Sequence, residues 1–211
     1  MTIAMTHFLI IRHGETLWNR EHRIQGHRNS ELSTTGLTQA EAVARRLGSA
    51  GATHLVSSDL GRTVQTATPL AQVTGLTINT DERLRERHYG VFEGLDTAEI
   101  RLRYPAEYAR WQAREPHFAM PGGESLMDLR ARLTLCMEEI AALGHAKVVV
   151  VTHGGVLDAL YRIATATPVD TVRNWELANA SVNDIVIENG AWRVVGWGDI
   201  AHLNETSDDF A

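Results

Sequence analysis

Two uninterrupted apolar runs stand out along the chain. Residues 8–11 lead into His13, and residues 148–151 lead into His153. Apolar runs without alternation are typical of strands that are buried on both faces, as in the parallel sheet of an α/β domain. Since such sheets bind ligands beyond the carboxyl ends of their strands, we expect the two imidazoles to lie side by side at one edge. A single histidine after a strand is more often a packing residue, so it is the recurrence that indicates a functional site.

The pattern between and after these runs alternates between strands and helices. Asp59 is the expected N-cap of one helix, and Ser125 with Asp128 resembles the capping box of another. Near the end of the chain, an Asn-Gly pair at 189 and 190 separates two apolar stretches and predicts a β-hairpin. Helices are expected over residues 37–47, 64–73, 126–140 and 156–163, short strands over 54–56 and 76–79, and hairpin strands over 182–188 and 191–197.

This alternation predicts a three-layer α/β/α fold with a mostly parallel central sheet and an antiparallel C-terminal strand. The length of 211 residues favours a single domain that spans residues 1–211. Residues 96–121 interrupt the pattern with three prolines and several aromatic residues. We expect them to form a small helical insertion over the active site, either as a lid or as a wrapped surface subdomain.

The composition limits the partners and the compartment. The net charge of −6 argues against nucleic acid or an anionic membrane as a partner. No apolar stretch approaches the roughly 18 residues of a membrane span, and the first residues lack the basic region of a signal peptide. The single cysteine, Cys136, lies among apolar residues and is expected in the core, without an intramolecular disulfide. We therefore expect a cytoplasmic protein.

Charged residues near the two histidines suggest the chemistry. Arg12 precedes His13, and Arg62 lies in the first turn of a predicted helix, where the helix dipole disfavours a cation unless an anion is bound. A solvated arginine is the alternative. Cations beside an imidazole disfavour a metal site, whereas two guanidiniums suit a phosphoryl group. They would also lower the pKa of His13 and keep it nucleophilic.

The residues around His13 form the sequence Arg12-His13-Gly14-Glu15-Thr16, and Asn19 follows shortly after. Further motifs come in the order Gln25-Gly26, Ser58-Asp59-Leu60-x-Arg62, Leu84-x-Glu86-x-x-x-Gly90, Thr152-His153-Gly154-Gly155 and Asn179-x-Ser181-Val182-Asn183. Together they resemble the histidine phosphatase superfamily, which has the phosphoglycerate-mutase-like fold, over almost the whole chain.

The resemblance implies a role for each matched residue. His13 would be the nucleophile that becomes phosphohistidine, and Glu86 would be first the general acid and then the base. The family implies neither a metal nor a cofactor. Without the resemblance, the segment around Glu86 would be interpreted as a charged surface loop. The residues expected to hold the phosphoryl oxygens are Arg12, Arg62 and His153, with Asn19, Gln25, Gly26 and Gly154 as peripheral ligands.

Departures from the mutase branch of the family bear on the reaction. Where mutases have a lysine, this chain has Thr97, and where they have two arginines after a tryptophan, it has Gln112-Ala113. Those cations would hold the carboxylate and the second phosphate of a mutase substrate. The resemblance therefore favours a metal-independent phosphomonoesterase, a hydrolase that acts on a small phosphorylated metabolite and releases inorganic phosphate.

Two other functions stay open at this point. Residues 86–90 match mutases closely, so phosphoglycerate mutase is the first alternative. A non-catalytic module that binds a phosphorylated ligand or a protein is the second. The sequence names neither the substrate nor the oligomeric state, and it allows a homodimer.

Overall fold

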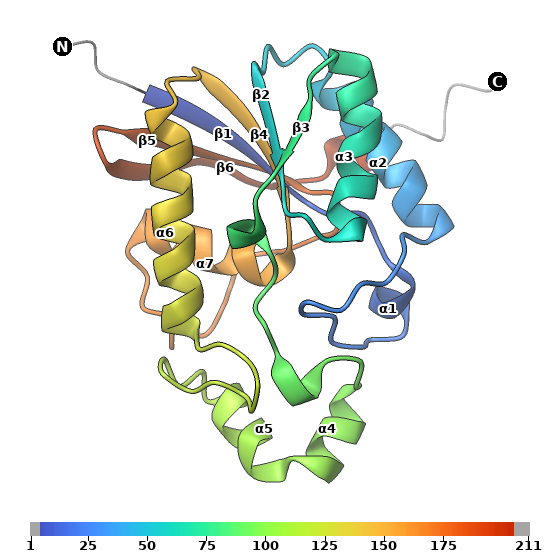
Figure 1. Cartoon of the computed structure of the whole chain (residues 1–211), viewed down its shortest axis with the longest axis vertical. Coiled ribbons are helices and arrows are strands. Elements are labelled where there is room, and N and C mark those ends of the chain that lie inside the picture. Colours follow the sequence, from blue (N-terminus) through green and yellow to red (C-terminus); the bar gives the residue numbers. More distant parts are fainter. Residues whose placement is uncertain (1–4, 205–211) are drawn as a thin grey trace.

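The computed structural model describes residues 5–204, which fold around a six-stranded sheet in the order β3-β2-β4-β1-β5-β6 (Figure 1). The strands are β1 Met5–Arg12, β2 His54–Ser57, β3 Ile78–Thr80, β4 Lys147–Thr152, β5 Val182–Glu188 and β6 Ala191–Asp199. β3, β2, β4 and β1 run parallel to one another. β5 pairs antiparallel with β1, and β6 pairs antiparallel with β5. The predicted, mostly parallel sheet is confirmed, and its antiparallel part comprises two strands.

Helices cover both faces of this sheet (Figure 1). α6 and α7 pack on one face through an apolar cluster that includes Phe8, Ile10 and Cys136, and α2 and α3 pack on the other through Ile11 and Leu70. These three layers confirm the predicted fold class. The helices are α1 Leu17–Arg20, α2 Thr34–Leu47, α3 Gly61–Thr74, α4 Thr97–Arg103, α5 Pro105–Gln112, α6 Leu126–Ala142, α7 Gly154–Thr165 and α8 Ala201–Asn204, with short 3-10 helices η1 Glu82–Leu84 and η2 Gly90–Phe92.

Two adjacent strands bring the predicted histidines together. β1 pairs in parallel with β4, and Arg12 lies opposite Thr152 in the register. Side chains of a strand alternate between the two faces, and both faces are covered here, so apolar residues are needed at successive positions. This explains the unbroken apolar runs. The residues that follow, His13 and His153, leave the sheet at the same edge.

The C-terminal hairpin follows the local rules of its sequence. Asn189 and Gly190 have φ angles of 51° and 78°, and a type I′ turn requires positive values at both positions. The predicted hairpin is therefore confirmed. The capping box of α6 is also present, because Ser125 and Asp128 each accept a hydrogen bond from the other's backbone N–H.

The start of α3 differs from the prediction. Leu60, not Asp59, occupies the N-cap position, and no side chain caps this end. The Asp59 carboxylate instead accepts a hydrogen bond from Arg85 Nε at 2.7 Å. An ion pair with a distant residue has replaced the local cap, and local sequence rules do not anticipate such a partner.

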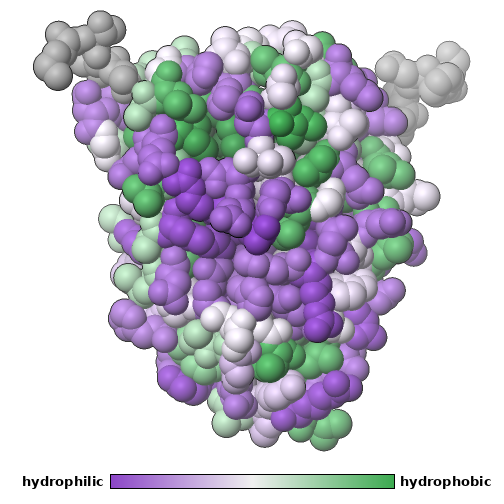
Figure 2. All heavy atoms as spheres, in the orientation of Figure 1, coloured by the Kyte–Doolittle hydropathy of each residue, from purple (hydrophilic) through white to green (hydrophobic). Residues whose placement is uncertain are grey.

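Residues 96–121 form α4 and α5 and pack around an apolar cluster of their own. This cluster includes Phe92, Ile100, Tyr108 and Phe118. Figure 1 shows α4 and α5 beyond the carboxyl ends of the parallel strands. Figure 2 shows the molecule in the same orientation, and hydrophilic residues gather across the middle of this view, between the insertion and the helices that cover the sheet. Within residues 5–204, no helix has the length and apolar character that crossing a membrane requires.

Candidate active site

The two histidines predicted from the strand ends lie next to each other. The ring centroids of His13 and His153 are 5.3 Å apart, with an angle of 64° between the ring planes. Both side chains are buried, with 3% of His13 and none of His153 exposed. Two buried imidazoles thus lie side by side at the carboxyl edge of the sheet.

The orientation of His13 is set by the backbone of the residue that follows it. Nδ1 lies 2.8 Å from the carbonyl oxygen of Gly14. In the neutral ring this contact assigns the proton to Nδ1 and leaves the lone pair on Nε2. Gly14 is needed here because a Cβ at this position would lie 2.5 Å from the carbonyl oxygen of Gly36. Burial, and then the charges of Arg62 and Arg12, lower the pKa of His13 well below its ordinary value, so the ring is neutral at pH 7.

Two arginines supply positive charge beside the histidines. The Arg62 side chain is fully buried, and its terminal nitrogens donate to the carbonyl oxygens of Arg28 and Gly26, both at 2.8 Å. Burial lowers the pKa of Arg62 to about 10, so the guanidinium is still charged at neutral pH. Arg12 donates to the carbonyl oxygen of Leu177, and burial lowers its pKa as well.

Several buried nitrogens of these side chains lack a hydrogen-bond partner among the described residues. They are Arg12 Nε, Arg62 Nε and His153 Nδ1, while His153 Nε2 lies 2.9 Å from Ser58 Oγ. Leaving a buried polar atom unpaired costs about 1–3 kcal/mol. Unpaired donors of this kind suit an oxyanion that binds beside His13.

Glu86 is held by two backbone N–H groups. Oε2 accepts from Gly155 at 2.9 Å and Oε1 accepts from Arg87 at 2.8 Å. A Cβ at position 155 would lie 2.3 Å from Glu86 Oε1, so a side chain there would displace this carboxylate from its present position. The carboxylate is therefore fixed against the first turn of α7, next to the end of β4.

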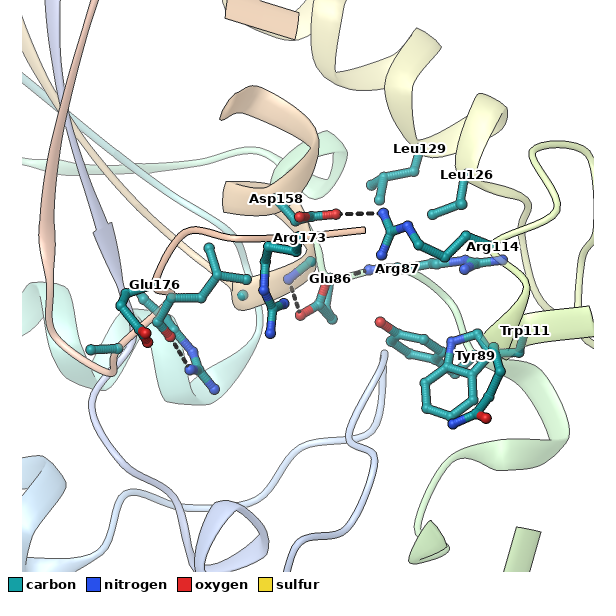
Figure 3. A pocket seen from close by; sticks show the side chains of 16 residues that line it. Glu86, Arg87, Tyr89, Trp111, Arg114, Leu126, Leu129, Asp158, Arg173 and Glu176 are labelled. Atoms are coloured by element: carbon teal, nitrogen blue, oxygen red, sulfur yellow. Dashed lines mark hydrogen bonds and ion pairs between the residues drawn. The ribbon is translucent and has the colours of Figure 1, made fainter. Parts of the chain in front are cut away.

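A cavity of about 620 Å³ opens beside Glu86 (Figure 3). Tyr89 and Trp111 form an aromatic part of its wall, and Trp111 belongs to α5 of the insertion. Arg12 and Gly154, which line the cavity, are the sequence neighbours of His13 and His153, and the two histidines are not themselves part of its wall. The other lining residues are Arg87, Gln112, Arg114, Leu126, Leu129, Gly155, Asp158, Arg173, Glu176, Leu177 and Ala178.

The peripheral candidates have mixed surroundings. Asn19 Oδ1 accepts from the backbone of Thr16 at 3.1 Å and from Asn179 Nδ2 at 3.3 Å, so this oxygen caps α1. The Gln25 side chain is buried, and its Oε1 has no partner among the described residues. Gly26 supplies the carbonyl that binds Arg62, and Gly154 begins α7 beside Arg12.

Sequence reasoning missed three residues of the site. Ser58 contacts His153, the backbone of Gly155 holds Glu86, and Asp158 binds Arg114 with an N–O distance of 2.7 Å. Ser58 and Gly155 lie inside motifs that match the family, so the sequence could have marked them as site residues. It could not have shown which side chains they contact. Within residues 5–204, no group of three or more His, Cys, Asp or Glu side chains is arranged to hold a metal ion.

A mostly parallel sheet whose two central strands are each followed by a histidine is typical of the phosphoglycerate-mutase-like class of α/β proteins. The chain belongs to the histidine phosphatase superfamily (branch 1), whose sequence model matches residues 8–200. The resemblance in the motifs is thereby confirmed.

Relatives with different names share this family. A probable phosphoglycerate mutase, GpmB, from Proteus mirabilis is 36% identical over 211 residues, which cover 97% of this chain and 98% of the relative. The solved structure of Bacillus stearothermophilus YhfR has a TM-score of 0.88 and 32% identity, covering 94% of this chain and 99% of that one. A mycobacterial glucosyl-3-phosphoglycerate phosphatase has a TM-score of 0.81 and 33% identity, covering 92% and 99%. An enzyme that is a phosphatase or a mutase follows from this family.

Proposed function

We propose that the protein is a metal-independent phosphomonoesterase that hydrolyses a small phosphorylated metabolite through a phosphohistidine intermediate. The observation that carries this proposal is the neutral, buried His13 beside His153, with Arg12 and Arg62 close enough to lower its pKa. Phosphoryl transfer needs an in-line nucleophile and positive charge around the equatorial oxygens, and this set of side chains supplies both.

The reaction would proceed in two steps. In the first, the lone pair of His13 Nε2 attacks phosphorus, the bond to the ester oxygen breaks, and Glu86 gives its proton to the leaving alkoxide. Arg12, Arg62 and His153 donate to the phosphoryl oxygens. In the second step, Glu86 takes a proton from water, the water oxygen attacks phosphorus, and the bond to His13 breaks. Inorganic phosphate leaves, and both groups regain their starting protonation.

The protein partners of two cavity arginines favour hydrolysis over a mutase reaction. Arg114 is already bound to Asp158, and Arg87 already donates to the backbone oxygens of Glu124 and Phe118, at 3.0 and 2.9 Å. A mutase must retain a bisphosphorylated intermediate, and cations that are bound to protein partners are poorly placed to do so. Phosphoglycerate mutase is the second candidate, because a relative of that name is 36% identical along nearly the whole chain.

We also propose that the chain acts in the cytoplasm as one domain, and that the insertion of residues 96–121 contacts the leaving group through Trp111. The presence of Trp111 in the cavity wall supports the last point.

The test is hydrolysis of p-nitrophenyl phosphate in the presence of EDTA. We expect turnover by the wild type and a loss of about 10³-fold or more in kcat for His13→Ala, because this variant lacks the nucleophile. His117→Ala, which changes an exposed histidine outside the cavity, should keep full activity. Rapid quench with ³²P-labelled substrate should trap an acid-labile label on the wild type alone.

Other outcomes would identify the other functions. Conversion of 3-phosphoglycerate to 2-phosphoglycerate, faster than phosphate release, would make the protein a mutase. Binding of inorganic phosphate without turnover of any ester would make it a binding module. Undiminished hydrolysis by His13→Ala would contradict the assignment of the nucleophile.

A further inference from the structure

The segment that carries Glu86 has no regular secondary structure of its own. It connects η1 to η2 and belongs to neither a helix nor a strand, so no ladder of backbone hydrogen bonds supports it. In Figure 1 it runs between α6 and the loop that follows α1. The backbone oxygens of such a segment need partners from side chains or water. Those partners determine where the Glu86 carboxyl group lies.

Arg132 of α6 supplies two of these partners. Its Nη1 donates to the carbonyl oxygen of Arg83 at 2.6 Å, and its Nη2 donates to that of Glu86 at 3.0 Å. Nε and Nη2 also donate to the Glu124 carboxylate, at 3.0 and 2.6 Å, and this pair of bonds fixes the plane of the guanidinium. The Arg132 and Glu124 side chains are only 20% and 17% exposed, so water competes little for these bonds.

Two further contacts tie the same segment in place. His27 Nε2 lies 2.9 Å from the Glu86 carbonyl oxygen, and since a carbonyl oxygen only accepts, Nε2 carries the proton. Glu124 Oε1, which Arg132 holds, accepts from the backbone N–H of His88 at 2.9 Å. Arg132 therefore supports the segment directly through Glu86 and indirectly through Glu124, whereas His27 supports it at one atom.

Arg132 can influence the reaction only through Glu86, because Glu86 lines the cavity and Arg132 does not. One of the two N–H groups that hold the Glu86 carboxylate is that of Arg87, in the same segment. A shift of the segment would thus move the carboxylate together with one of its donors. A general acid must lie within hydrogen-bond reach of the leaving oxygen, and a displacement of about 1 Å can cost about 10²-fold in rate.

We propose that Arg132 is a positioning residue, which holds the Glu86 carboxyl group where it can give its proton to the leaving oxygen. This inference rests on the proposed role of Glu86 in hydrolysis and adds to it a residue outside the cavity. Its consequence is that the effect of Arg132 on the rate depends on the leaving group, because only a poor leaving group needs the proton.

The test compares kcat/KM for glycerol 2-phosphate, a poor leaving group, with that for p-nitrophenyl phosphate. We expect Arg132→Gln to slow the first about 10–10²-fold more than the second, chiefly through kcat, because no substrate contact is lost. Arg132→Lys keeps the charge but cannot bind Glu124 and the Glu86 carbonyl together, so its ratio should be intermediate. In the control Arg83→Gln, the arginine that is removed also binds α6, through Glu139 at 2.6 Å, and the ratio should stay that of the wild type.

A double variant separates positioning from a general structural role. Glu86→Gln has no proton to deliver, so adding Arg132→Gln to it should leave the ratio between the two esters unchanged. A residue that only stabilised the fold would slow both esters alike, with or without the Glu86 carboxyl group. Should Arg132→Gln fail to fold, Arg132→Lys takes its place in both comparisons.

Two results would overturn the inference, provided that Glu86→Gln itself distinguishes the esters. One is an equal loss on both esters in Arg132→Gln, and the other is a further change of the ratio in the double variant. A Glu86→Gln variant that slows both esters equally would refute the general acid, and with it the role of Arg132. A wild type without any phosphatase activity would instead refute the proposed function itself.

Discussion

Lowering the pH from about 7.5 to about 5.5 should destabilise the fold through His13 and His153. Burial is the largest cause that lowers the pKa of each histidine well below its ordinary value, and the charge of Arg62 is the next. In the unfolded chain both rings have a pKa of about 6.5. Below that pH the unfolded state binds protons that the native state does not, so the free energy of unfolding falls as the pH falls. Above it, the native state has no such disadvantage.

The magnitude follows from the number of buried rings. Each ring that stays neutral in the native state lowers the free energy of unfolding by about 1.4 kcal/mol over this pH interval. The two rings together lower it by about 2.7 kcal/mol. Because the rings are 3% and 0% exposed, solvent screening reduces this value little. The loss should continue below about pH 5.5, until the lowered native pKa values are reached.

Urea unfolding at the two pH values measures this loss. Other histidines also titrate, so the comparison is with a double variant, His13→Asn with His153→Gln. Asn can retain the donor to the carbonyl of Gly14, and Gln can retain the contact with Ser58. The double variant should lose about 2.7 kcal/mol less than the wild type, and each single variant about half of that. Equal pH dependence in all four proteins would refute the reasoning, because the native rings would then titrate as they do in the unfolded chain.

Two further predictions concern a catalytic group and a buried ion pair. Glu86→Gln should slow the hydrolysis of glycerol phosphate by about 10²–10⁴-fold, and that of p-nitrophenyl phosphate far less, since p-nitrophenolate leaves without a proton. A similar loss of kcat/KM on both esters would argue against a general acid at this position. Asp158→Ala leaves Arg162, which is 1% exposed, and Arg114 without their carboxylate, so urea unfolding should show a loss of about 3–5 kcal/mol. The control Glu115→Ala, which breaks an exposed pair, should cost less than about 1 kcal/mol, and equal costs would contradict the role of burial.

The elements that the sequence predicts well are those that local rules determine. β1 and β4 were evident because burial on both faces demands apolar residues at every position, and the hairpin because its turn demands Asn-Gly. The N-cap of α3 could not be predicted, because Asp59 is bound by Arg85, which is distant in the chain. A side chain that finds a long-range partner leaves no trace in the local pattern.

The same limit applies to the site. The two histidines could be placed from the strands, Arg62 was a candidate from its place at a helix start, and the family motifs supplied Glu86. The loop before β5, which carries Arg173, is anchored by hydrogen bonds from Arg162 to backbone oxygens. Every residue offers a backbone oxygen, so such an anchor imposes no recognisable sequence. The cavity wall could therefore be described only from the structure.

The way in which Arg62 is held has a consequence for how this protein can diverge. Its two terminal nitrogens are bound by the main chain at positions 26 and 28. The exposed side chain of Arg28 can therefore be exchanged without moving the guanidinium. Position 26 has no such freedom, because its φ angle is +54° and a Cβ there would lie 2.0 Å from Glu93 Oε1. Within one short loop, substitution is therefore tolerated at position 28 and disfavoured at position 26, although the backbone at both positions binds the same guanidinium.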